Sequence, residues 1–287
     1  MKKLKYFFQF FFIMLFFIIF KLIGHKLSIK FSGYIFFIFG HFFRSNKLAE
    51  TNLKKAFPLM SLIERKKILK NMWLNYGAIF SEYAFIKKFS CKKNYFSKIK
   101  VENYEIINEL KKVNKPVIFI SGHFSNFELM AMCIEKFGIN LAAIYRPLNN
   151  IFLNPVMEKI RKKYICKNQI KKGKAGTKDL LKKFKKNTSV ALMIDQRVSE
   201  GINSNFFNHS ALTTTIPAQF VKKYNIKIVP VYIERLKQNN FKLKFYNPIK
   251  FEKTDNIQTI TDHLNRVLEK MIIRNPSQWI WTHNRWK

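Results

Sequence analysis

One short segment of the sequence places a histidine and a carboxylate at a spacing that suits acid–base chemistry. His123 and Glu128 are separated by four residues in Ser121-Gly-His-Phe-Ser-Asn-Phe-Glu128. A carboxylate that contacts one ring nitrogen of a histidine fixes its tautomer and leaves the other nitrogen free to act as a general base. The pattern therefore predicts a catalytic pair in which Glu128 orients and stabilises the imidazole of His123.

The same spacing has a simpler structural interpretation. Ser125 and Glu128 form the Ser-x-x-Glu pattern of a capping box, in which the glutamate only satisfies a backbone amide at the start of a helix. Under this interpretation the helix starts at Ser125 and His123 is an ordinary loop histidine. Because a His-x4-Glu pattern arises by chance in many proteins, the fold around it has to decide between the two.

The histidine follows an apolar run, residues 116–121, that is typical of a buried strand. Further strand-like runs cover residues 140–145, 189–195, 226–234 and 241–246. Helical patterns cover residues 61–83, 129–137, 154–164, 177–185, 216–224 and 257–274, the first of them opening on a Ser-x-x-Glu capping box. This alternation predicts an α/β fold with a central mixed sheet flanked by helices. His123 then lies at the carboxyl edge of the sheet, where ligand and catalytic groups gather.

Two further polar residues follow predicted strands at this edge. Arg146 comes after residues 140–145 and can bind a substrate phosphate or steady developing charge. Asp195 ends the run of residues 189–195 and can help to position a partner. Each also has an ordinary explanation, as a solvated loop arginine and as a turn residue.

The composition limits the class of partner. Lys and Arg number 53 against 17 Asp and Glu, which gives a formal net charge of +36, while 48% of residues are hydrophobic and 31 are Phe. Such high hydrophobicity argues against intrinsic disorder. The charge instead favours nucleic acid, an anionic membrane or acidic proteins and substrates. The three cysteines, Cys91, Cys133 and Cys166, have no paired spacing, so they predict buried thiols in a reducing compartment and no disulfide or zinc site.

Residues 1–45 have the composition of a membrane anchor, and residues 46–287 are predicted to form one catalytic domain. The apolar run of residues 6–20 follows three lysines and is roughly 22 Å long as a helix, short of the ~30 Å hydrocarbon core of a bilayer. Residues 34–43 are typical of an interfacial segment. A cleaved signal peptide is the main alternative, although no small-x-small cleavage site follows. Whether the anchor crosses the bilayer or lies in one leaflet stays open.

Several segments, taken in order, resemble one known family. Residues 122–128 are similar to the His-x4-acid motif of the lysophospholipid acyltransferase superfamily, and the form with Glu resembles the lipid A late acyltransferases. The other segments that resemble this family are Ala49–Leu53 with Phe57-Pro58 and Glu64-Arg65, Tyr145–Pro147, Asp195-Gln196 with Phe206-Phe207, and Trp279–Lys287. Asn208 departs from the pattern, since a glycine usually follows the Phe pair.

The resemblance implies an acyltransferase that moves a fatty acyl chain from an acyl-acyl carrier protein to a hydroxyl of a lipid A precursor. It implies a bacterial inner-membrane location and no cofactor or metal. The lysines on the two sides of the apolar run are nearly balanced, so the reducing compartment indicated by the cysteines puts the catalytic domain on the cytoplasmic face. His123 is then the general base and Glu128 its partner, while Asn126, Arg146 and Asp195 bind substrate. The surplus of lysines suits an anionic membrane and an acidic carrier.

Two alternatives remain. The acceptor can be another glycolipid or a glycerophospholipid. Outside enzymes, a membrane-tethered nucleic-acid-binding protein explains the charge, but it explains neither His123 nor Glu128, and no zinc finger, RNP or helix-turn-helix signature is present. We therefore expect no nucleic-acid partner. The terminal Trp-rich segment is either an interfacial aromatic belt or ordinary packing.

Overall fold

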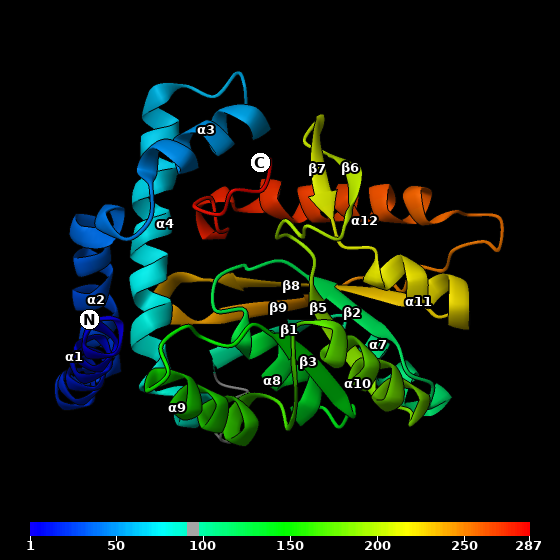
Figure 1. Ribbon diagram of the computed structural model, residues 1–287, viewed down its shortest axis with the longest axis horizontal. Coiled ribbons are helices and arrows are strands. Elements are labelled where there is room, and N and C mark those ends of the chain that lie inside the picture. Colours follow the sequence, from blue (N-terminus) through cyan, green and yellow to red (C-terminus); the bar gives the residue numbers. More distant parts are fainter. Residues whose placement is uncertain (91–97) are drawn as a thin grey trace.

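The computed structural model describes residues 1–90 and 98–287, apart from the side chain of Lys174 (Figure 1). Its helices are α1 (Lys2–Ile23), α2 (His25–Phe39), η1 (Gly40–Phe42), α3 (Asn46–Ala56), α4 (Leu62–Tyr83), α5 (Ile86–Phe89), α7 (Glu105–Val113), α8 (Glu128–Lys136), α9 (Leu153–Ile160), η2 (Arg161–Ile165), α10 (Lys174–Lys185), α11 (Ile216–Tyr224), η3 (Lys237–Asn239), α12 (Ile257–Arg274) and η4 (Pro276–Gln278). Its strands are β1 (Ile99–Glu102), β2 (Ile118–Ser121), β3 (Leu141–Tyr145), β4 (Asn168–Lys171), β5 (Ser189–Met193), β6 (Ile202–Phe206), β7 (His209–Thr213), β8 (Ile228–Arg235) and β9 (Phe241–Phe245).

Seven of the described strands form one mixed sheet in the order β1-β9-β8-β2-β5-β3-β4, and β6 pairs separately with β7. Strands β8, β2, β5, β3 and β4 run parallel to one another, whereas β9 and β1 run in the opposite direction. Helices flank this sheet (Figure 1). The predicted α/β fold with a central mixed sheet is therefore confirmed.

The paired strands β2 and β5 mark the point where the chain changes direction across the sheet. From β2 the chain passes through α8 to β3 on one side, and from β5 it passes through α11 to β8 on the other side. Right-handed crossovers in opposite directions put these helices on opposite faces of the sheet. A crevice opens where two such connections diverge at the carboxyl ends of the strands, and ligands bind there in many α/β proteins.

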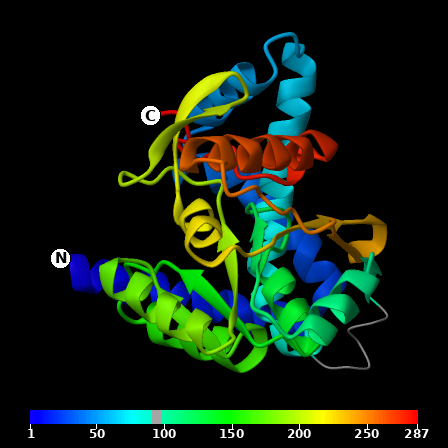
Figure 2. The ribbon, with the colours of Figure 1, turned by 90° about the vertical axis from the view of Figure 1, so that its right-hand side faces the viewer.

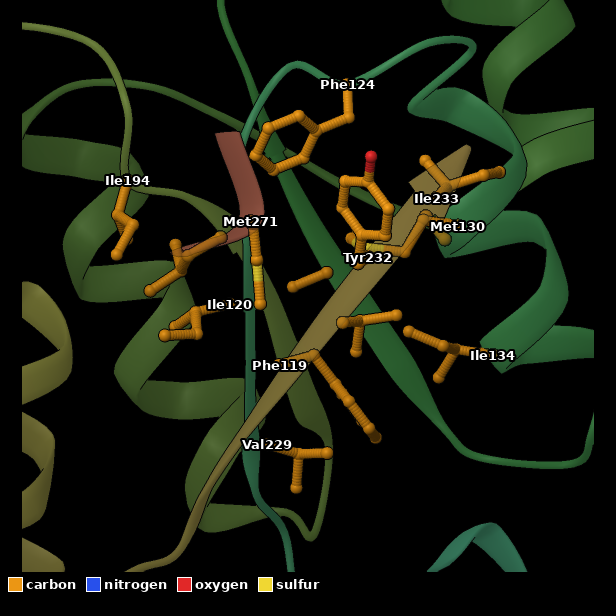
Figure 3. Packing of buried hydrophobic residues seen from close by; sticks show 14 of the residues in the cluster. Phe119, Ile120, Phe124, Met130, Ile134, Ile194, Val229, Tyr232, Ile233 and Met271 are labelled. Atoms are coloured by element: carbon orange, nitrogen blue, oxygen red, sulfur yellow. The ribbon is translucent and has the colours of Figure 1, made fainter. Parts of the chain in front are cut away.

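The core beneath this edge of the sheet is apolar on both faces, because the central strands are covered by helices on each side. Every residue of β2 is buried, including Phe119 and Ile120. Figure 3 shows Phe124, just beyond β2, pointing toward Tyr232 of β8, and the two ring centroids are 5.1 Å apart. The loop that carries His123 is therefore anchored directly on the core.

The elements with strong patterns lie where the sequence predicts them. Helix α4 begins after Ser61, which forms the predicted capping box with Glu64, and α11 and α12 match their predicted ranges. Strands β1 and β4 were not predicted because they are short edge strands of four residues each. The β6–β7 hairpin was missed because its first strand carries polar side chains at alternate positions.

Helix α2 extends the predicted segment of residues 34–43 backwards to His25 and packs along α4. The two helices come very close where Gly77 meets α2, since a Cβ at Gly77 would lie 2.2 Å from the carbonyl oxygen of Ser32.

Cys133 and Cys166 are buried, as expected, whereas Cys91 lies outside the described residues.

Candidate active site

His123 and Asp195 face each other at the carboxyl edge of the sheet. Each lies two residues beyond the end of its strand, and the strand ends Ser121 and Met193 are paired in register. Nδ1 of His123 lies 2.8 Å from Oδ1 of Asp195, and the backbone N–H of His123 donates to Oδ2 at 2.7 Å. The indole N–H of Trp279 donates to the same Oδ2 at 2.9 Å. These bonds fix the fully buried carboxylate of Asp195 against the histidine.

The backbone of the loop around His123 is shaped by the residues on either side, Gly122 and Ser125. Gly122 leaves room for the ring of Phe124, which a Cβ at position 122 would approach to 3.0 Å. Ser125 has a left-handed backbone with φ of 43°, which turns the chain back toward α8. The side chain of His123 stays 20% exposed, so it can meet a substrate from solvent.

The electrostatics of the pair favour a charged imidazole. Burial disfavours the imidazolium of His123, but the charge and hydrogen bond of Asp195, helped by the charge of Glu128, outweigh burial and raise the pKa of His123. Burial also opposes the charge of Asp195, yet His123 and Trp279 hold the pKa of that carboxyl below its usual value. With Nδ1 engaged by Asp195, Nε2 of His123 is the ring atom left to take a proton.

The structure corrects the predicted partner of Glu128. Oε1 of Glu128 accepts hydrogen bonds from Nε of Arg161 at 2.8 Å and from the hydroxyl of Tyr83, and Nη2 of Arg161 lies 2.7 Å away. The ring of His123 pairs with Asp195, because strand pairing brings their two loops together, while Glu128 begins α8 and meets Arg161 of η2. Glu128 is close enough for its charge to raise the pKa of His123, but it does not orient the ring.

The capping-box interpretation is also wrong. Helix α8 begins at Glu128, and the residue before it, Phe127, provides no side-chain cap. The left-handed backbone of Ser125 is unsuited to an N-cap, which takes an extended conformation. The buried hydroxyl of Ser125 has no hydrogen-bond partner among the described residues. The carboxylate of Glu128 therefore binds the side chains of Arg161 and Tyr83 and does not cap the backbone at the start of α8.

Tyr83 and Arg161 are the functional neighbours that the sequence did not reveal. They lie 45 and 33 residues from Glu128 along the chain, so no local spacing could connect them. Burial and the adjacent carboxylate raise the pKa of Tyr83, while Glu128 more than offsets burial and raises the pKa of Arg161. The hydroxyl therefore stays protonated and the guanidinium stays charged.

The remaining two predicted substrate-binding residues lie in different settings. Asn126 is buried, and its Nδ2 donates to Oε2 of Glu82 at 2.9 Å. Glu82 in turn pairs with Arg235, whose Nη2 lies 3.0 Å from the same oxygen. Arg146 is exposed and is the first residue after β3, at the same edge of the sheet as His123. Arg146 is therefore open to solvent, whereas Asn126 faces the interior.

The C-terminal segment packs beneath the site and is not an exposed aromatic belt. Trp279 and Trp281 are 1% and 0% exposed. Asn52 of the Ala49–Leu53 motif holds this segment, because its Nδ2 donates to the carbonyl oxygens of Trp281 and His283 at 2.8 Å each. Burial lowers the pKa of His283 to about 4, so this second histidine is neutral at physiological pH.

A cavity of about 440 Å³ lies away from these residues, at the junction of α1 and α2. It is lined by Ile23, Gly24, His25, Lys26, Leu27, Phe85, Lys88, Phe89 and Lys98. None of the predicted site residues lines it. Within residues 1–90 and 98–287 there is no group of three or more His, Cys, Asp or Glu that could hold a metal ion.

Comparison with known proteins identifies relatives over nearly the whole chain. The sequence profile of a family described as bacterial lipid A biosynthesis acyltransferase matches residues 1–287. The lipid A biosynthesis palmitoleoyltransferase of Escherichia coli K12 is 24% identical over 254 residues, covering 85% of this chain and 79% of that protein. The lipid A biosynthesis lauroyltransferase of the same strain is 25% identical over 253 residues, with the same coverage. Lipid A biosynthesis acyltransferase 2 of Shigella flexneri is 22% identical over 246 residues, which cover 83% of this chain and 76% of the relative.

Proposed function

We propose that this chain, which belongs to the bacterial lipid A biosynthesis acyltransferase family, transfers a fatty acyl chain from an acyl-acyl carrier protein thioester to a hydroxyl of a lipid A precursor. The chain is an acyltransferase of lipid A biosynthesis. The observation that carries the mechanism is the bond between Nδ1 of His123 and Asp195, which leaves Nε2 available as a base.

One proton is transferred twice in the reaction, first from the acceptor hydroxyl to His123 and then from His123 to the departing thiolate. Nε2 of His123 takes the proton of the acceptor hydroxyl while the hydroxyl oxygen attacks the thioester carbonyl carbon. The resulting tetrahedral intermediate collapses, the carbon–sulfur bond breaks, and the departing thiolate takes the proton from the imidazolium. The products are an ester of the acceptor and the free thiol of the carrier. Because the acceptor attacks directly, no serine or cysteine nucleophile is required.

The carboxylates around His123 have distinct roles in this mechanism. Asp195 orients the ring and fixes its tautomer, as a buried carboxylate does beside a catalytic histidine. Glu128, held by Arg161 and Tyr83, supplies a second negative charge that stabilises the imidazolium. Arg146, exposed at the same edge, binds a phosphate of the acceptor.

The charge of the chain agrees with these partners. A net charge of +36 attracts both an acidic carrier protein and a leaflet of anionic lipid. The helix α1 is long and apolar enough to associate with a membrane. We place the protein at the bacterial inner membrane, with its catalytic part on the cytoplasmic face, where the acyl carrier is found.

The test is acyl transfer by the purified full chain in detergent, with a labelled acyl-acyl carrier protein and a lipid A precursor. His123→Ala should abolish transfer while the protein stays folded, whereas Glu128→Ala should slow transfer and also lower stability, because it leaves Arg161 without its carboxylate partner. His209→Ala, an exposed histidine on β7, is the matched control and should retain full activity. Full activity of His123→Ala would refute the mechanism. Transfer to glycerophospholipid but not to the lipid A precursor would refute the acceptor.

A further inference from the structure

Helix α1 has two different apolar faces. One face carries large exposed side chains that recur every three or four residues, which places them on one side of a helix. They are Leu4, Phe8, Phe11, Leu15, Ile18 and Leu22, with exposed fractions between 41% and 80%. The opposite face packs on the protein, and its Phe20 is completely buried.

The start of α1 is attached to the catalytic part of the chain. Nδ2 of Asn150 donates to the carbonyl oxygen of Tyr6 at 2.8 Å. The ring of Phe152 meets those of Phe7 and Phe10, with centroid distances of 5.9 and 6.3 Å. Asn150 and Phe152 lie in the connection between β3 and α9, which also carries Arg146.

The end of α1 is attached to the same body. The rings of Phe16, Phe17 and Phe20 lie within 6.3 Å of Phe80 of α4, measured between centroids. Helix α4 also supports the site, because it ends at Tyr83, the partner of Glu128. The two ends of α1 are therefore held by the elements that carry Arg146 and Tyr83.

Helix α2 continues the exposed apolar surface. Its Leu27, Phe31, Tyr34 and Ile38 share one side of the helix and are between 44% and 60% exposed. Figure 1 shows α1 nearly end-on and α2 upright beside α4, both in the outermost layer on the left of the molecule; Figure 2 shows α1 from the side. Two helices that run in different directions thus lie together in the outermost layer, and each leaves one apolar side exposed.

A membrane-crossing α1 conflicts with these attachments. A helix of 22 residues is about 33 Å long, enough for the ~30 Å hydrocarbon core. Crossing would carry the irregular connection around Asn150, and the nearby Arg146, to the opposite side of the bilayer from the end of α1. Irregular backbone cannot lie in hydrocarbon unless protein buries it.

We infer that α1 lies in the plane of a single leaflet, with its exposed apolar face and that of α2 among the lipid chains. The partner is one anionic leaflet, whose phosphates meet the exposed lysines at the ends of α1, namely Lys2, Lys3, Lys5, Lys21 and Lys26. This inference rests on the membrane association in the proposed function. It places the Arg146 connection at the lipid head groups, so an acceptor can reach His123 without leaving its leaflet.

Cysteine labelling of the full chain decides between the two arrangements. Lys2→Cys, before α1, and Lys47→Cys, exposed on α3, are compared with the unmodified chain using a membrane-impermeant maleimide. An in-plane helix puts both cysteines on one side, so both react in inverted vesicles and neither in spheroplasts, where a periplasmic marker protein shows that the reagent works. Reaction of position 2 and position 47 from opposite sides would overturn the inference.

Depth measurements in vesicles containing anionic phospholipid provide a second test. Spin labels at positions 4, 11 and 18 lie on the exposed face, and an in-plane helix gives them similar depths. A crossing helix would separate the first and the last by about 21 Å along the bilayer normal. If the protein washes off vesicles in carbonate, membrane association itself fails. Acyl transfer in detergent still reports on the proposed reaction separately.

Discussion

Asp195 binds His123 twice, through Nδ1 of the ring at 2.8 Å and through the backbone N–H at 2.7 Å. The two contacts use different carboxylate oxygens, so they fix both the ring and the loop that carries it. The arrangement follows from the paired ends of β2 and β5 rather than from any local motif. The carboxylate that orients the base is thus supplied by the neighbouring strand.

Asp195→Asn should slow acyl transfer by about 10²- to 10⁴-fold, because an amide no longer stabilises the imidazolium and can favour the wrong tautomer. The variant should also shift the pH profile. Asp195 raises the pKa of His123, and a general base works in its neutral form, so activity rises with pH through that pKa. Loss of the charge lowers the pKa, and the acidic limb of kcat/KM should move to lower pH.

Asp179→Asn is the matched control for this prediction, since Asp179 is an exposed carboxylate on α10. Its rate and its pH profile should match those of the unmodified chain. If the acidic limb of Asp195→Asn stays in place while the rate falls, Asp195 supports the fold of the site without tuning His123.

Trp279→Phe should lower kcat by roughly tenfold or more, because a hydrogen bond to a charged group contributes about 1.5–3 kcal/mol. The change keeps an aromatic ring but removes the N–H that donates to Oδ2 of Asp195. Trp281→Phe is the control, since its N–H donates to the carbonyl oxygen of Pro276. Both variants should be compared in kcat and in melting temperature; equal losses of activity in the two would mean that the effect is only structural.

The fold was predictable where a segment's own pattern determines its structure. The buried run before Gly122 and the capping box at Ser61 gave β2 and α4 correctly, because burial and capping act over a few residues. Edge strands such as β1 and β4 could not be predicted, since whether such a short segment forms a strand depends on the neighbouring strand with which it pairs. Sequence periodicity carries no signal for that choice.

The site was predictable in part for the same reason. The sequence could indicate His123, Glu128 and Asp195 as candidates because each follows or begins an element with a clear pattern. The pairing of His123 with Asp195 could not be predicted. These two residues are 72 positions apart in the sequence, whereas Glu128 is only five positions from His123 and therefore seemed the nearer partner. Arg161, on a π-helical turn after α9, gave no local signal at all.

Glu82→Gln should destabilise the protein by about 3–5 kcal/mol, the usual cost of removing one partner from a buried ion pair. The side chain of Glu82 is fully buried and binds both Arg235 and Asn126. Glu102→Gln is the control, because its pair with Lys244 spans 3.6 Å between side chains that are 31% and 25% exposed. This control should change stability by less than about 1 kcal/mol. Chemical unfolding in detergent measures both, and similar values would contradict the special role of the Glu82 pair.

Arg146→Ala should raise KM for the lipid acceptor by about tenfold, equivalent to roughly 1.4 kcal/mol of binding, and leave kcat nearly unchanged. The reason is its position: Arg146 is exposed at the same edge of the sheet as His123, where it can bind a phosphate. Arg146→Lys should restore only part of the affinity, because lysine lacks the bidentate geometry of arginine. Lys159→Ala, an exposed cation on α9, should leave KM unchanged. Kinetics with a phosphorylated acceptor and its dephosphorylated form complete the test, since the effect of Arg146→Ala should vanish with the second. A KM that is unaffected by Arg146→Ala, or an equal effect on both acceptors, would remove Arg146 from phosphate binding.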